Sequence, residues 1–176
     1  MNEAMLAATV ETFAGQHPAM DAALLLGYAR VALARYHNSP ADFVFCHGEE
    51  EWPATVVFDC PDPRSQDTLE REDFVEKGAI VLAGVLLQHF EGRQITRVMK
   101  RGSHVDYFVG EAPGDTRWIL EVGGTDEQNF TALRNRKRRQ LEGSPYRFPP
   151  HGKDGFVSVT RFAPDAAAAC DFIPSA

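Results

Sequence analysis

The chain lacks any hydrophobic run long enough to cross a membrane. Its longest apolar stretches, residues 22–29 and 78–87, fall well short of the about 20 residues that a membrane-spanning helix needs. Near the amino terminus, Glu3 stands where a secretory signal would carry Lys or Arg, and no cleavable apolar segment follows. We therefore expect a cytoplasmic protein without a membrane partner.

Cysteine is scarce, and the common catalytic sequence motifs are missing. The three cysteines, Cys46, Cys60 and Cys170, are odd in number and lack the paired short spacing of a zinc site, which favours buried thiols in a reducing compartment. A disulfide between Cys46 and Cys60 across a hairpin is the alternative. The sequence has no P-loop, GxSxG, HExxH, CxxC or GxGxxG, which argues against nucleotide hydrolysis, esterase, zinc-protease and Rossmann functions.

Positive charge is scarce in the first half of the chain. The net charge is -7, but residues 1–92 hold 15 acids and 5 bases, whereas residues 93–161 hold 8 acids and 13 bases. The acidic half disfavours indiscriminate binding to nucleic acid, and the basic half is able to present a local positive surface to phosphate. Simple solvation of two helix faces would produce the same distribution.

One compact unit is expected for 176 residues of which 44% are hydrophobic. Residues 2–15 and 19–36 are rich in Ala and Leu, and the Gly15–Pro18 segment between them would end one helix and start the next. This pattern predicts an N-terminal helical hairpin in residues 1–38, followed by an α/β domain in residues 39–176.

The α/β domain is predicted to open with a β-hairpin and a buried helix. Residues 43–45 and 55–58 flank the acidic Glu49–Glu51, an arrangement typical of two strands joined by a solvated turn. Residues 74–90 contain a long apolar stretch, and a helix that is hydrophobic nearly all round must be buried.

After residue 95 the hydrophobic period changes to two. Three short segments rich in β-branched and aromatic residues predict an antiparallel meander: residues 95–101, 104–110 and 116–123. Thr125 or Asp126 is expected to cap a helix running to about Leu141, and residues 156–162 predict a further strand. The expected core is therefore a helix, three strands, a helix and a strand in a mixed sheet.

Two acidic residues are expected to meet in this meander. Side chains alternate across a strand, so Asp106 and Glu121 share one side of the sheet if the hairpin brings them into register. Neighbouring carboxylates repel each other, and a divalent cation such as Mg²⁺ or Mn²⁺ is the natural counter-charge. Glu76, in the first turn of the buried helix, supplies a third acid. Metal-assisted phosphoryl chemistry follows as a hypothesis, with two polar residues on a half-solvated sheet as the alternative.

These residues resemble the PD-(D/E)XK nuclease superfamily. Asp106 lies fifteen residues before Glu121, an apolar dipeptide precedes Glu121, and Glu76 lies in a helix that enters the core. Over about residues 74–162 the expected order of helix, three strands, helix and strand is similar to the core of that superfamily. The resemblance implies a metal ion held by Asp106, Glu121 and the Val122 carbonyl, with Glu76 assisting.

A closer likeness concerns shorter segments. Residues 105–110, residues 120–125 and the basic helix that ends in Lys137 and Gln140 are similar to a group of small bacterial proteins without an assigned function. That likeness indicates a fold and names no activity.

The sequence departs from the superfamily at Gly123. The resemblance implies a lysine there, two residues after the acidic ligand, whose ammonium would orient the attacking water and balance charge in the transition state. Lys137, which shares an apolar helix stripe with Phe130 and Leu133, is the predicted replacement, although many lysines simply snorkel along such a stripe. The arginines beside it are predicted to contact phosphate: Arg134, Arg136, Arg138 and Arg139.

Three functions are compatible with these observations. The first is a divergent nuclease-like enzyme that cleaves phosphodiester bonds of nucleic acid with Mg²⁺ or Mn²⁺. The second is an inactive protein of the same fold that binds a protein partner through the N-terminal helical hairpin or the acidic hairpin, in a bacterial assembly such as a defence system, or forms a homo-oligomer. Gly123 and the negative net charge favour it. The third is a nucleic-acid-binding module that uses the Arg-rich helix without cleavage.

Overall fold

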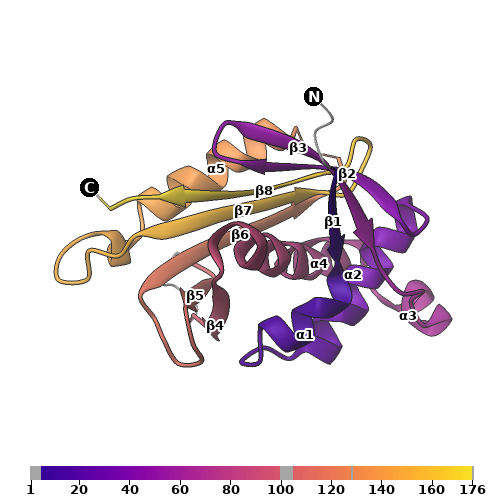
Figure 1. Cartoon of the computed structure of the whole chain (residues 1–176), viewed down its shortest axis with the longest axis horizontal. Helices are drawn as coiled ribbons and strands as arrows, with labels where there is room; N and C mark the ends of the chain where they lie inside the picture. Colours follow the sequence, from indigo (N-terminus) through magenta and orange to yellow (C-terminus); the bar gives the residue numbers. More distant parts are fainter. Residues whose placement is uncertain (1–4, 100–104, 128, 176) are drawn as a thin grey trace.

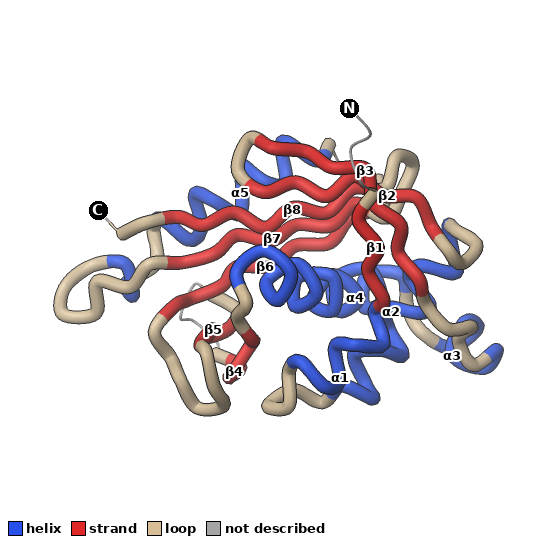
Figure 2. Tube along the Cα trace, in the orientation of Figure 1, coloured by secondary structure: helices blue, strands red, loops and turns tan. Residues whose placement is uncertain are grey.

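Eight strands of the described residues pair into one mixed sheet. The computed structural model describes residues 5–99, 105–127 and 129–175. The strands lie in the order β1-β3-β2-β8-β7-β6-β5-β4 (Figure 2). Their bounds are β1 Leu6–Thr9, β2 Ala41–His47, β3 Glu50–Val57, β4 Gln94–Val98, β5 Tyr107–Gly110, β6 Trp118–Thr125, β7 Gly155–Arg161 and β8 Ala167–Ile173.

Helices cover both faces of this sheet. The helices are α1 (Phe13–Gln16), α2 (Ala22–Tyr36), α3 (Pro63–Thr68), α4 (Arg71–Leu86) and α5 (Phe130–Glu142), with short 3-10 turns at Val10–Thr12 and Pro145–Arg147 and a π turn at Leu87–Glu91. α2 and α4 pack together on one face, and α5 lies on the other face against β6 and β7 (Figure 1). No helix of the described residues is both long and apolar enough to span a bilayer.

The predicted order of core elements is confirmed from α4 to β7. α4 is followed by the antiparallel strands β4, β5 and β6, then by α5, and then by β7, which lies parallel to β6. The buried helix and the β2–β3 hairpin are confirmed as well. The ends of the predicted segments 95–101 and 104–110 that fall on residues 100–104 lie outside the described residues.

The predicted helix over residues 2–15 is wrong. Leu6–Thr9 form the edge strand β1, which runs parallel to β3 with Leu6 opposite Ala54 and Thr9 opposite Val57, and only short helical turns follow. Leu6 packs on the core while Ala7 is exposed, so pairing with the edge of β3 outweighs the helix propensity of alanine. The second helix is confirmed as α2, and no helical hairpin exists in residues 5–38.

Three smaller predictions also need correction. The cap of α5 is Asn129, whose Oδ1 accepts a hydrogen bond from the Ala132 amide at 3.0 Å; Thr125 is still part of β6. Of the acidic residues of the hairpin, Glu50 and Glu51 belong to β3, because Gly48 makes the turn with a φ of 63°. Cys60 is exposed, so the prediction of buried thiols is wrong there; all three cysteines are free, and the alternative disulfide is not formed.

Candidate active site

Asp106 and Glu121 lie together on the α5 side of the sheet. β5 and β6 pair with Tyr107 opposite Leu120, and the Asp106 amide extends this pairing by donating to the Leu120 carbonyl at 3.0 Å. The Asp106 carboxylate accepts a hydrogen bond from the Val122 amide at 2.8 Å, which fixes its orientation. The structure therefore brings the two predicted carboxylates to one place, as the alternation of side chains predicts.

Lys137 reaches this pair from α5. Its ammonium nitrogen lies 2.8 Å from Glu121 Oε2 and 3.7 Å from Asp106 Oδ2. Leu133 and Leu141, one helical turn before and after it, are buried against the sheet and set the rotation of the helix. Lys137 thus points inward because it shares the apolar stripe of α5.

Gly123 leaves room for this lysine. A Cβ atom at position 123 would lie 3.2 Å from Lys137 Cε and 3.3 Å from Lys137 Cγ, so the lysine stem occupies the space beside β6 that a side chain there would need. The neighbouring Gly124 has a different role, because a Cβ there would lie 2.1 Å from the Val75 carbonyl oxygen of α4. Gly123 therefore allows Lys137 to lie close to β6, and Gly124 allows the backbone of α4 to do so.

The two carboxylates of the site differ in exposure and in how readily they ionise. Glu121 is 4% exposed, whereas the Asp106 side chain is 41% exposed. Burial, followed by repulsion from Asp106, raises the pKa of Glu121 to about 7, although the ammonium of Lys137 opposes this shift. Glu121 is therefore harder to ionise than an exposed glutamate, even with an ammonium group beside it.

An open pocket of about 390 Å³ adjoins this cluster. Its walls come from α4, β5, β6 and α5, and its polar lining residues are Glu76, Lys77, Asp106, Arg136, Lys137 and Gln140. Glu76 is exposed on the α4 wall, and the described residues contain no group of three His, Cys, Asp or Glu side chains able to surround a metal ion. Glu76 therefore shares the pocket but does not join the two carboxylates in a three-acid cluster.

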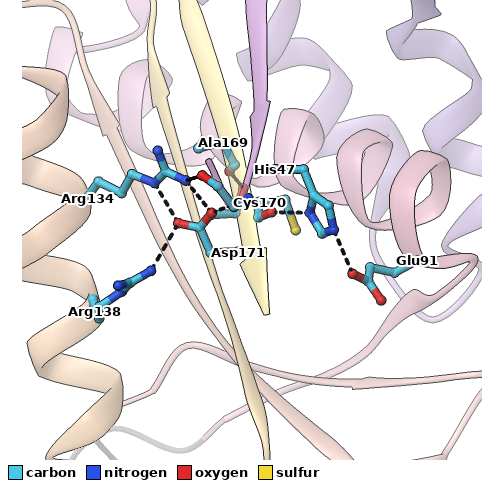
Figure 3. A network of polar contacts seen from close by, with 9 residues as sticks. His47, Glu91, Arg134, Arg138, Ala169, Cys170 and Asp171 are labelled. Atoms are coloured by element: carbon cyan, nitrogen blue, oxygen red, sulfur yellow. Dashed lines mark hydrogen bonds and ion pairs between the residues drawn. The ribbon is translucent and has the colours of Figure 1, made fainter. Parts of the chain in front are cut away.

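The four predicted phosphate-contacting arginines separate into different roles. Arg134 donates to both oxygens of Asp171, at 2.6 Å for its Nε, and its Nη2 donates to the Gly48 carbonyl at 2.6 Å (Figure 3). Arg138 lies 3.9 Å from the same carboxylate, which is 1% exposed. Arg136 lines the pocket, and Arg139 is exposed on α5. Arg134 therefore holds α5 against β8 through this contact.

Asp171 is the important residue that the sequence did not reveal. It lies in the same cross-strand row as Glu121, because both pair with Val157 of β7. The α5 face of the sheet thus carries two buried carboxylates, each met by a cation from α5. The alanine-rich sequence of β8 gives no strand signal, so nothing indicated which way Asp171 points.

Comparison of the chain with protein-family models, with curated proteins and with solved structures found no match in any of the three. The site is therefore interpreted from its own chemistry.

Proposed function

We propose that the protein is a metal-dependent phosphodiesterase of the nuclease type and that the pocket beside Asp106 and Glu121 is its active site. The observation that carries the proposal is the Lys137 ammonium group, which lies within 4 Å of both carboxylates in the space left by Gly123. The order of elements from α4 to β7 supports it further, because the resemblance to the PD-(D/E)XK superfamily implies that same order.

The donor set fits Mg²⁺ or Mn²⁺. Proteins commonly bind Mg²⁺ through one or two carboxylates, with water and substrate phosphate completing the shell, so a third acid is not required. Asp106 and Glu121 would hold the ion with the Val122 carbonyl, and a bound dication would favour the ionised form of Glu121. When bound, such an ion polarises a phosphoryl oxygen and lowers the pKa of a coordinated water.

The protein's own residues would perform the remaining tasks. Lys137 would orient the attacking water and offset the negative charge that develops on the phosphate, from a position fixed by its contact with Glu121. Arg136, at the pocket wall, would bind a non-bridging phosphate oxygen, for which a planar guanidinium is well suited.

The test is cleavage of single-stranded DNA and RNA by the purified chain with and without Mn²⁺. We expect cleavage that depends on the metal and falls at least ~100-fold in Asp106→Asn and in Glu121→Gln. Glu142→Gln, which alters an exposed acid of α5, is the matched control and should cleave normally. Metal-independent cleavage, or equal rates in all variants, would contradict the proposal. Folded protein with neither metal binding nor cleavage would instead favour partner binding through the exposed acids Glu49–Glu51 at the end of the β2–β3 hairpin.

A further inference from the structure

The charges around the carboxylate pocket limit the length of nucleic acid that it is able to hold. A protein that grips a duplex typically neutralises about six to ten phosphates with lysine and arginine. The basic residues of α5 are the natural source of such contacts here. Most of the α5 cations that lie near the sheet already contact a carboxylate.

On α5, three of the five cations lie beside buried carboxylates: Arg134 and Arg138 beside Asp171, and Lys137 beside Glu121. Lys137 contacts Glu121 at 2.8 Å, and Arg134 donates to Asp171 and to the Gly48 carbonyl. Arg136 is the arginine of this helix that lines the pocket. Among the described residues that line the pocket, a phosphate therefore meets Arg136 in addition to Lys137, since Lys77 is paired with Asp73 at 2.7 Å.

On the α4 side, the pocket is lined by Glu76 and by Lys77, whose ammonium group lies 2.7 Å from Asp73, and more acids lie beyond them. A neighbouring hollow shares Glu76 with the pocket and is also lined by Glu72, Asp126 and Glu127. Arg71, the arginine of this hollow, lies 2.6 Å from Asp126 and 2.5 Å from Glu127. Further phosphates that extended along this side would be repelled by the remaining carboxylates.

From this arrangement, and resting on the proposed function, we infer that the substrate is a short, flexible phosphodiester: a dinucleotide or the terminal nucleotides of a single strand. A volume of about 390 Å³ suits a ligand of that size. One phosphate would lie between the carboxylate pair and Arg136. In the hydrolysis, the water oxygen bonds to phosphorus, the ester bond to one sugar oxygen breaks, and the proton released by the water ends on that oxygen, giving a phosphomonoester and an alcohol.

The experiment compares kcat/KM for thymidine dinucleotide, a 20-nucleotide single strand and the matching duplex, with Mn²⁺ at 50 and 200 mM salt. We expect cleavage of the dinucleotide and of strand ends, a loss of less than about tenfold between the two salt concentrations, and a duplex rate at least tenfold lower. Cleavage of the dinucleotide alone would identify the free dinucleotide as the substrate. Release of terminal nucleotides from the 20-nucleotide strand would identify the end of a single strand as the substrate.

Two variants and two possible outcomes distinguish the proposed substrate from the proposed phosphodiesterase activity. Arg136→Ala should lower kcat/KM for the dinucleotide about tenfold, whereas Arg64→Ala, which removes an exposed cation of α3, should not. Internal cleavage of the duplex at the single-strand rate, with a loss of about a thousandfold at the higher salt, would overturn the inference and leave the proposed function standing. No cleavage of any substrate would overturn the proposed function itself.

Discussion

The side chain of Lys137 on α5 fills the space that a side chain at residue 123 of β6 would occupy. Its Cε lies 3.2 Å from the position of a Cβ atom on Gly123, and its ammonium group lies 2.8 Å from Glu121, two residues earlier on the same strand. Helix α5 therefore supplies a cation beside Glu121, at the place that a side chain at position 123 of β6 would reach. The missing side chain at Gly123 is a condition for this arrangement.

The two adjacent glycines of β6 should differ in how they tolerate a methyl group. In Gly124→Ala the new Cβ would lie 2.1 Å from the Val75 carbonyl oxygen, and relief requires movement of α4, so we expect a loss of about 3 kcal/mol in the free energy of unfolding. In Gly123→Ala the new Cβ would lie 3.2–3.3 Å from the stem of Lys137 and from Leu133 Cδ1, side-chain atoms that need to move only slightly, so the loss should stay below about 1 kcal/mol. Urea denaturation measures both, and equal losses would contradict this account of the two contacts.

Alanine substitutions of Arg134 and Arg136, two residues apart on α5, should have different effects: the first should lower stability and the second should lower activity. Arg134→Ala leaves the buried Asp171 carboxylate without its main partner, and we expect the free energy of unfolding to fall by about 3 kcal/mol. Arg136→Ala alters an exposed side chain and should change that free energy by less than about 0.5 kcal/mol while weakening cleavage. Urea denaturation of both variants is the check, and an Arg134→Ala protein as stable as the unmodified chain would contradict the structural role.

His17 should make the protein less stable in mild acid. Its ring is fully buried, stacks on Phe13 with ring centroids 4.5 Å apart, and accepts a hydrogen bond from the Ile95 amide at 2.9 Å through Nδ1. Burial lowers the pKa of His17 to about 4. The unfolded chain therefore binds this proton more readily, so the stability from neutral His17 is complete above about pH 6.5 and is lost as the pH falls to about 4.

The expected loss between those pH values is about 3 kcal/mol, from about 1.4 kcal/mol for each unit of pKa shift. Urea denaturation at pH 6.5 and pH 4.5 should show a smaller decrease for His17→Gln than for the unmodified protein, because the carboxylates are common to both and glutamine retains an acceptor for the Ile95 amide. If the two proteins lose stability in parallel, another group is responsible.

Local patterns predicted the centre of the site, and long-range packing determined what they missed. Alternation along two strands was sufficient to place Asp106 beside Glu121, and the helical period was sufficient to turn Lys137 inward. β1 and β8 were missed because alanine-rich segments indicate helix or give no signal, and their conformation follows from the strands beside them. The partnership of Arg134 with Asp171 depends on the position of β8, so no pattern within α5 was able to reveal it.

Relocating the lysine tests the central claim most directly. We expect Lys137→Ala to lose at least ~100-fold in the rate of metal-dependent cleavage, because the cation beside both carboxylates is removed. The double variant Gly123→Lys/Lys137→Ala has room for the new side chain once the stem of Lys137 is gone, and it should recover at least tenfold of that loss. A Lys137→Ala protein that cleaves as fast as the unmodified chain would contradict the claim that Asp106, Glu121 and Lys137 act together.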